Sequence, residues 1–244
     1  MTTYGLVGYP LGHSFSRHFF TKKFASEGHD ALYLNFEIPS IEMFPDIIKE
    51  NTCLQGLNVT IPYKQQVMLY LDEISPEAQA IGAVNVVKID DCRKLTGYNS
   101  DVIGFVNSIK PLLKPHHKKA LILGTGGASK AIHYGLTKKL EIETMFVSRQ
   151  SREGMITYED ITSSLLKEYE VIVNCTPSGM FPHIDECPAL PYEAMNEAHL
   201  LYDLVYNPEE TLFLKKGAIQ GATVKNGLEM LHLQALASWD FWNN

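Results

Sequence analysis

The sequence predicts an α/β protein of two domains, each built around a mainly parallel sheet. Short apolar runs alternate with helical periodicity along the chain, as strands and helices do in α/β folds. A glycine-rich turn at 124–128 separates a four-residue apolar run from a helical pattern, an order that presents backbone N–H groups to a phosphate. The length of 244 residues suffices for two small domains, and the polar, proline-containing segment 114–119 is their expected joint.

Composition and charge narrow the class of protein. Hydrophobic residues make up 45% and charged residues 20% of the chain, as in soluble globular proteins, and the net charge of −7 argues against a nucleic-acid partner. No run approaches the ~18 apolar residues of a membrane-spanning helix, and the N-terminus lacks a secretory signal pattern. The four cysteines form no C-x-x-C pair, so we expect reduced thiols and no metal site. We therefore expect a cytoplasmic protein without a membrane partner.

The N-terminal half begins with a strand at 4–8 and a helix that starts near Ser16, a good N-cap residue. An Asp-Asp turn at 90–91 between two strand-like runs predicts a β-hairpin. Further strands are expected at 31–36, 54–60, after Gly82 and at 94–98, and further helices at 41–49, 65–71 and 102–113.

The C-terminal half repeats this alternation. Its final helix has apolar residues on most sides, which predicts that the helix is buried. Strands are expected at 120–123, 144–147, 171–175, 200–205 and 222–224, and helices from the glycine turn to Leu136, at 211–216 and at 228–242.

Polar side chains follow predicted strands in the N-terminal half, where ligands bind to parallel sheets. Thr60 and Lys64 follow one strand, and Lys64 opens a helix whose positive dipole end disfavours a charged lysine. Asp101 follows another strand, and a carboxylate beside a lysine can set its proton affinity. Asn85 interrupts an apolar run and needs polar partners if it is buried.

Each of these residues also has a plainer interpretation. Ser14, Ser16 and Asp101 suit helix N-caps, and a lysine such as Lys64 is usually a solvated surface residue. The residue types alone leave both interpretations open.

The glycine turn predicts a dinucleotide site. Gly124 permits the tight turn, Gly126 leaves room for a pyrophosphate, and the small Ser129 lets the helix pack close to its strand. The next strand ends in Ser148 and Arg149, where an NAD site usually has an acidic residue; an arginine can instead grip a 2′-phosphate. NADP is therefore favoured over NAD, with a simple surface arginine pair as the alternative.

Seven motifs in order closely resemble those of the shikimate dehydrogenase family, and the resemblance covers essentially the whole chain. They are Gly-Tyr-Pro-Leu-Gly-His-Ser at 8–14, Asn-Val-Thr-Ile-Pro-Tyr-Lys at 58–64, Gly-Ala-Val-Asn at 82–85, Gly-Tyr-Asn-Ser-Asp-Val-Ile-Gly at 97–104, Gly-Thr-Gly-Gly-Ala at 124–128, Asn-Cys-Thr-Pro-Ser-Gly-Met at 174–180 and Asp-Leu-Val-Tyr-Asn-Pro at 203–208.

The resemblance implies a substrate-binding catalytic domain, residues 1–103 plus 228–244, and a Rossmann-like NADP-binding domain, residues 104–227. It implies reversible reduction of 3-dehydroshikimate to shikimate with NADPH, in the chorismate pathway of aromatic amino-acid biosynthesis, by a monomer or homodimer without a metal. Lys64 would be the acid–base residue and Asp101 its partner.

By matching position, the resemblance also assigns binding residues. Those for the substrate are Ser14, Ser16, Thr60, Lys64, Asn85, Asp101, Tyr206 and Gln234. Those for the cofactor are Gly124, Thr125, Gly126, Gly127, Ala128, Ser148, Arg149, Gln150, Arg152, Leu204 and Gly227.

One departure and three rivals remain. The family's usual Asn-Arg-Thr is Ser148-Arg149-Gln150 here, and the second arginine, Arg152, falls one position early. The rivals are a quinate/shikimate dehydrogenase of broader specificity, a non-catalytic dinucleotide-binding regulator on the same scaffold, and a folate-type dehydrogenase. The last would not need the carboxylate site of Ser14 and Ser16.

Overall fold

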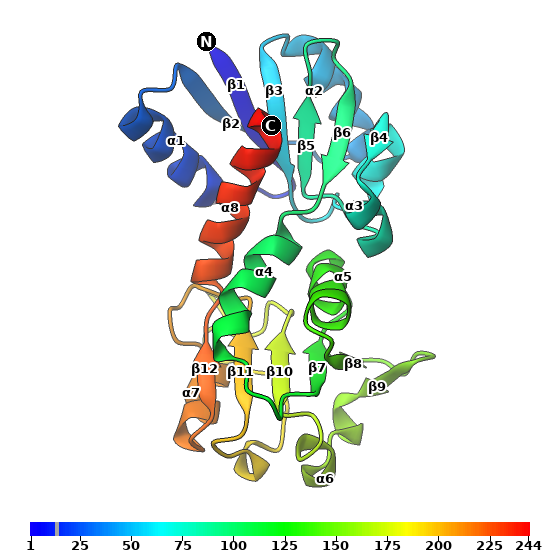
Figure 1. The fold of residues 1–244 in the computed structure, drawn as a ribbon, viewed down its shortest axis with the longest axis vertical. Helices are drawn as coiled ribbons and strands as arrows, with labels where there is room; N and C mark the ends of the chain where they lie inside the picture. The colour runs from blue at the N-terminus through cyan, green and yellow to red at the C-terminus, as the bar shows by residue number, and fades with distance from the viewer. Residues whose placement is uncertain (13–14) are drawn as a thin grey trace. The chain divides into compact units, whose positions relative to one another are not determined.

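A computed structural model describes residues 1–12 and 15–244, which form two compact units (Figure 1). The first unit contains residues 1–100 and 234–244, and the second contains residues 101–233. The expected joint at 114–119 is wrong, because this segment lies inside the second unit. There His117 is 4% exposed, accepts from the backbone N–H of Lys114 at 3.0 Å and contacts the Ala198 carbonyl oxygen at 2.9 Å.

The sheet of the first unit has the strand order β2-β1-β3-β5-β6-β4. Strand β1 pairs in parallel with β2 and β3, β4 pairs in parallel with β6, and the expected hairpin is the antiparallel pair of β5 and β6. The strands are β1 (Thr2–Gly8), β2 (Ala31–Glu37), β3 (Leu54–Val59), β4 (Glu73–Ile74), β5 (Val86–Ile89) and β6 (Leu95–Tyr98).

The helices of the first unit are mostly short. Behind Lys64 the expected helix is a single 3-10 segment, too short to supply much of a helix dipole. The helical elements are α1 (Phe15–Glu27), η1 (Ile41–Met43), α2 (Phe44–Glu50), η2 (Gln66–Tyr70), α3 (Pro76–Ile81) and the end of α8 (Leu228–Asn243).

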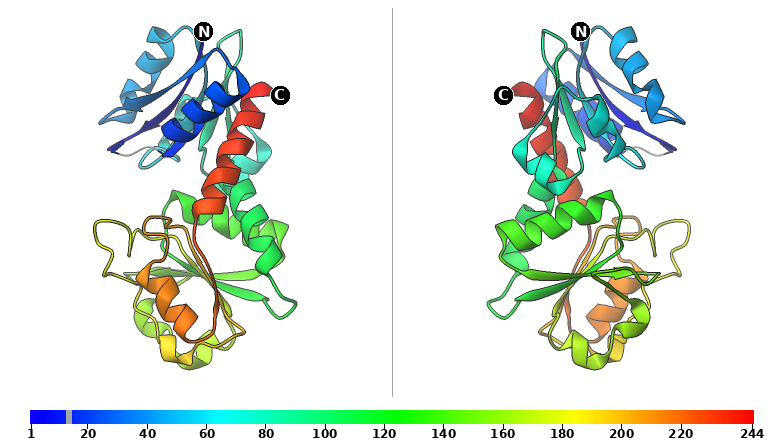
Figure 2. Two further views of the ribbon diagram at one scale, coloured as in Figure 1. Left: turned by 90° about the vertical axis from the view of Figure 1, so that its left-hand side faces the viewer. Right: turned by 90° about the vertical axis from the view of Figure 1, so that its right-hand side faces the viewer.

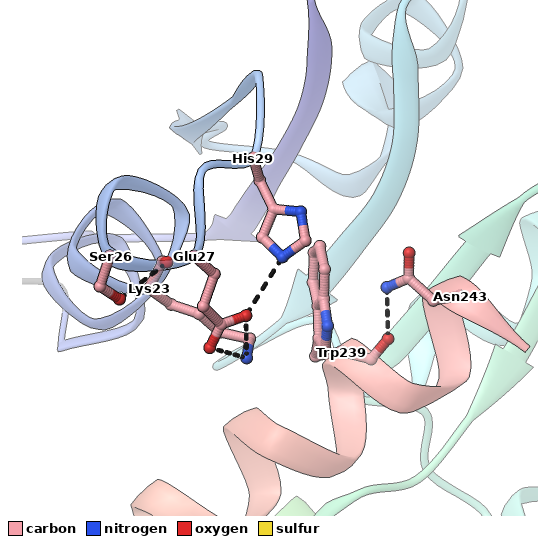
Figure 3. Close-up of polar contacts among 6 residues, drawn as sticks. All are labelled: Lys23, Ser26, Glu27, His29, Trp239 and Asn243. Atoms are coloured by element: carbon pink, nitrogen blue, oxygen red, sulfur yellow. Dashed lines mark hydrogen bonds and ion pairs between the residues drawn. The ribbon is translucent and has the colours of Figure 1, made fainter.

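Aromatic packing attaches the end of α8 to the first unit. The Trp242 ring lies 4.8 Å from that of Tyr4 and 5.1 Å from that of Phe20. A Cβ on Gly56 would lie 2.5 Å from the Trp242 indole, so this glycine makes room for the ring. Trp239 packs beside His29 and under the ammonium of Lys23 (Figure 3). The end of the final helix is therefore buried, as expected, against residues from distant parts of the chain.

The sheet of the second unit is entirely parallel, with the strand order β12-β11-β10-β7-β8-β9. This is the order of a doubly wound dinucleotide-binding sheet, and the order reverses between β7 and β10. The strands are β7 (Lys119–Leu123), β8 (Glu143–Ser148), β9 (Met155–Thr157), β10 (Val171–Asn174), β11 (Leu200–Asp203) and β12 (Thr223–Lys225).

Helices cover both faces of this sheet (Figure 2). One face packs on α4 (Asp101–Ile109), α5 (Gly127–Tyr134) and the start of α8; the other packs on α6 (Ser163–Leu166) and α7 (Leu212–Ile219). The shorter segments are η3 (Lys110–Leu112), the π-helical η4 (Gly135–Lys139), η5 (Tyr158–Asp160) and η6 (Tyr192–Ala194). Within residues 1–12 and 15–244, no helix has the length and apolar character needed to cross a membrane.

Candidate functional site

One edge of the first unit's sheet gathers most of its predicted site residues. Strands β1, β3 and β6 end at this edge, and the antiparallel β5 begins there, so Asn85 lies beside the end of β3. Thr60 and Lys64 follow β3, and Ser16 lies in the first turn of α1, which follows β1. Ser14 lies outside the described residues.

The backbone around Lys64 is fixed from two sides. The Lys64 carbonyl accepts the N–H of Val84 at 2.7 Å, and the buried Tyr63 donates its hydroxyl to the carbonyl of Ile38 at 2.6 Å. The segment that carries Lys64 is thus tied to the loop that carries Asn85. Tertiary hydrogen bonds, and not the helix expected from the sequence, position this half-buried lysine.

A buried hydrogen-bonded network lies on the α1–α8 side of the same sheet. Tyr33 donates to Asn58 Oδ1 at 2.8 Å, and Asn58 Nδ2 donates to Ser238 on α8 at 2.9 Å. A hydrogen bond from Ser16 to the Tyr33 phenol opposes the rise in the pKa of Tyr33 that burial causes, but burial dominates. The phenol of Tyr33 therefore stays a neutral donor that connects α1 to β3.

Asn85 and Gln234 belong to this network through Ser100. Asn85 Nδ2 donates to Ser100 Oγ at 2.9 Å, while the Ser100 N–H donates to Asn85 Oδ1 at 2.7 Å. Ser100 Oγ donates in turn to Gln234 Oε1 at 3.3 Å. Side chains from a strand start, a strand end and the C-terminal helix are therefore held in one fixed polar arrangement.

Sequence reasoning missed four members of the network: Tyr33, Asn58, Ser100 and Ser238. The signal that singled out Asn85, a polar residue inside an apolar run, also applies to Asn58. Ser238 lies one helical turn after Gln234, which would have placed both on one face. Asn35 Oδ1, on β2, is a buried acceptor without a hydrogen-bond partner in the described chain, and nothing in the sequence predicted it.

In the second unit the glycine turn connects β7 to α5 at the point where the strand order reverses. Gly124 has φ +101°, which suits glycine, and a Cβ there would lie 3.0 Å from Thr176 Cγ2. The N-cap residue of α5 is Gly126, which has no side chain to hydrogen-bond the first N–H groups of the helix. Such N–H groups can bind an anionic ligand. Ser129 donates to the Gly126 carbonyl at 2.6 Å and holds the turn against its helix.

The end of β8 lies beside this turn because β8 pairs with β7. Ser148 is buried, and its hydroxyl accepts the N–H of Gln150 at 3.3 Å. Arg149 and Arg152 are exposed. Burial raises the pKa of Tyr158 and the positive charge of Arg149 opposes that rise, so the arginine lies near the phenol. The neighbourhood of the turn therefore carries positive charge.

Leu204 and Gly227 form a close backbone contact on the other side of the switch point. The Leu204 N–H donates to the Asn174 carbonyl at 3.0 Å, and the Gly227 N–H donates to the Val205 carbonyl at 3.2 Å. A Cβ on Gly227 would lie 2.2 Å from the Leu204 carbonyl oxygen. Tyr206, the next residue in this loop, is 37% exposed, and its partial burial raises its pKa.

The predicted substrate residues are divided between the units. Thr60, Lys64, Asn85 and Gln234 belong to the first unit together with Ser16, whereas Asp101 and Tyr206 belong to the second. Asp101 is the buried first residue of α4. The predicted cofactor residues all lie in the second unit.

Comparisons with known proteins identify relatives of this chain. Residues 6–87 match the family model described as the shikimate dehydrogenase substrate binding domain. A shikimate dehydrogenase (NADP(+)) of Methanococcus maripaludis is 36% identical over 98% of this chain and 90% of its own length. That of Desulforamulus reducens is 32% identical over 98% of this chain and 88% of its own length.

Solved structures of two dehydrogenases are also similar to this chain. Shikimate 5-dehydrogenase from Thermus thermophilus, in complex with NADP(H) and shikimate, has a TM-score of 0.87 at 31% identity, over 99% of this chain and 93% of that one. A quinate dehydrogenase from Corynebacterium glutamicum, in complex with NAD, has a TM-score of 0.88 at 25% identity over the same shares.

Proposed function

The chain belongs to the shikimate dehydrogenase family, and we propose that it catalyses the reversible NADPH-dependent reduction of 3-dehydroshikimate to shikimate. It is an NADP-dependent oxidoreductase of that family. The observation that carries the proposal for the substrate is the buried network of Asn85, Ser100 and Gln234, which holds polar groups at a sheet edge in fixed positions. Polar groups held in this way suit the recognition of a small acid with several hydroxyl groups.

The proposed chemistry centres on Lys64 and Asp101. The cofactor, when bound, supplies the hydride that reaches carbon 3 of the substrate. Lys64 gives its ammonium proton to the carbonyl oxygen as negative charge develops there, and in the reverse direction its amine takes the proton back. Asp101 is the carboxylate that partners and orients Lys64 in this proposal.

The remaining substrate residues have binding roles in this proposal. Ser14, Ser16 and Tyr206 hold the substrate carboxylate, and Thr60, Asn85, Asp101 and Gln234 bind its hydroxyl groups. Ser16 and Asn85 support the assignment because both are connected to the buried network.

The second unit fits the cofactor. At Gly126 neither the backbone nor a neighbouring atom requires glycine, since a Cβ would meet nothing within 4 Å and φ is −78°. The absent side chain leaves open space at a helix N-terminus, as a pyrophosphate requires. Residues 124–128 bind the pyrophosphate, residues 148–150 and Arg152 bind the 2′-phosphate, and the backbone of Leu204 and Gly227 lies at the nicotinamide end.

We assign residues 1–103 plus 228–244 to substrate binding and residues 104–227 to NADP binding. The observed units divide at Ser100 and at Gln234, a few residues from these boundaries. We place the enzyme in the cytoplasm as a monomer or homodimer, acting in aromatic amino-acid biosynthesis.

An assay of NADPH absorbance tests the function directly. With shikimate and NADP+ we expect turnover, and with NAD+ in place of NADP+ we expect kcat/KM to fall by at least about tenfold, because Arg149 and Arg152 match a phosphate. Equal rates with quinate and shikimate would favour the broader quinate/shikimate enzyme, to which the Corynebacterium glutamicum likeness points. Binding of NADP+ without turnover of either acid would identify a regulator.

Gly126→Ala tests the pyrophosphate site. We expect a change of less than about 1 kcal/mol in the free energy of unfolding, because the added methyl meets nothing. We expect NADP+ affinity to fall by at least about tenfold, because the methyl occupies the space of the pyrophosphate. Urea unfolding and calorimetric titration with NADP+ measure the two effects. An unchanged dissociation constant for NADP+ would contradict the assignment of the pyrophosphate to this turn.

A further inference from the structure

Asp203 is a buried carboxylate for which the proposed chemistry has no role. It ends β11, is 0% exposed, and pairs in parallel register with Asn174, which ends β10 and is also 0% exposed. Burial raises the pKa of Asp203 to about 6, although its three hydrogen bonds oppose the rise. Burying a carboxylate costs free energy unless hydrogen bonds or an opposite charge compensate for the lost hydration. The partners of Asp203 therefore indicate what this carboxylate does.

All three hydrogen bonds to this carboxylate come from neutral donors. Asn174 Nδ2 and the Val205 N–H donate to Oδ1, each at 3.0 Å, and Thr211 Oγ1 donates to Oδ2 at 2.6 Å. The short contact from Thr211 is typical of a hydrogen bond to an ionised oxygen. Asp203 thus connects the end of β10, the loop behind β11 and the N-cap of α7.

The contacts continue from Asn174 to the glycine turn. Asn174 Oδ1 accepts the backbone N–H of Thr176 at 3.0 Å and its hydroxyl at 2.6 Å. The methyl group of Thr176 is the atom that a Cβ on Gly124 would meet first. The hydrogen bonds therefore run from Thr211 through Asp203 and Asn174 to Thr176, whose methyl group lies next to the glycine turn.

The same contacts fix the backbone proposed for the nicotinamide end. Leu204 directly follows Asp203, and its N–H is bonded to Asn174. Val205 donates to the carboxylate and accepts from Gly227. The loop after β10 also contacts the loop after β11 further along the chain, where the Phe181 N–H donates to the Asn207 carbonyl at 3.1 Å.

We propose that Asp203 is a positioning residue of the cofactor site, which holds the loops behind β10 and β11 in the arrangement that accepts the nicotinamide half of NADP. The inference rests on the proposed function. Asp203 touches no reacting atom; its carboxylate acts through Thr211, Val205 and Asn174. An asparagine would keep the shape but present an NH2 group where Thr211 now donates, so the charge-assisted bond would be lost.

The experiment compares two ligands on the full chain by calorimetric titration. NADP+ occupies both halves of the site, whereas adenosine 2′,5′-bisphosphate occupies only the adenosine half. We expect Asp203→Asn to weaken NADP+ binding about tenfold, the effect of one lost bond to a charged group, and to change bisphosphate binding less than about twofold. Asp90→Asn, which alters an exposed carboxylate in the β5–β6 turn of the first unit, is the control and should change neither.

Thr211 provides an independent variant. Thr211→Val removes the same hydrogen bond and should also weaken NADP+ about tenfold, whereas Thr211→Ser keeps the hydroxyl and should bind as the wild type does. Because the two substitutions remove the same Thr211–Asp203 hydrogen bond, the double variant Asp203→Asn/Thr211→Val should lose about tenfold and not about a hundredfold. Equal weakening of both ligands, or no weakening of NADP+, overturns the inference. A wild-type chain that binds neither ligand overturns the proposed cofactor together with it.

Discussion

Lys64→Met is expected to lower kcat for shikimate oxidation about a thousandfold, while the dissociation constant of NADP+ changes less than about twofold. General acid–base catalysis typically contributes 10²–10⁴-fold, and methionine keeps the length and apolar stem of lysine without an exchangeable proton. The backbone hydrogen bond from Val84 to the Lys64 carbonyl does not involve the side chain and is kept. Steady-state rates and NADP+ titration measure the two quantities.

Lys49→Met is the matched control, since Lys49 is an exposed lysine near the end of α2 in the same unit. It should leave kcat within about twofold of the wild type, because surface substitutions away from a site have small effects. Retention of more than about a tenth of kcat in Lys64→Met would exclude the lysine as the acid–base residue. A parallel loss of NADP+ affinity would show that the variant damages the fold and not only the proton transfer.

The alternation of strands and helices was predictable because apolar periodicity is a local property of the sequence. The fold class and the hairpin at 90–91 were therefore confirmed. The short strands β4 and β9 were missed because two or three residues carry too little pattern to detect. Helix α7 was expected to end at Gly217 but continues to Ile219; there the missing Cβ admits Leu201, whose Cδ2 would otherwise lie 2.3 Å away.

The site residues proposed from the sequence lie in motifs at strand ends, whereas the residues that hydrogen-bond to them come from elsewhere in the sequence. Ser16 and Asn85 were predicted, yet the partners Tyr33, Ser100 and Ser238 come from other elements. The dipole argument for Lys64 failed because only a 3-10 segment follows it. The polar segment 114–119 was expected to join the domains, but its residue His117 is buried within the second unit, where it contacts the carbonyl of Ala198. Such contacts depend on the tertiary fold, which local composition does not encode.

Gly227→Ala is expected to lower the free energy of unfolding by about 2–3 kcal/mol and to weaken NADP+ binding. The new methyl would lie 2.2 Å from the Leu204 carbonyl oxygen and 2.7 Å from its carbonyl carbon. Both are backbone atoms, so no side-chain rotation relieves the overlap, and overpacking of this kind costs about 1–3 kcal/mol. The flanking hydrogen bonds to Asn174 and Val205 oppose a backbone shift.

Urea unfolding followed by circular dichroism measures this loss, with Gly126→Ala as the comparison. Both variants add one methyl group to the second unit at a predicted cofactor glycine, but only the one at Gly227 meets backbone. If Gly227→Ala unfolds at the wild-type urea concentration, the loops behind β11 and β12 can separate at little cost. Their close approach would then not be what fixes the nicotinamide end. If only Gly227→Ala is destabilised while both variants lose NADP+, one glycine serves the fold and the ligand together, and the other serves the ligand alone.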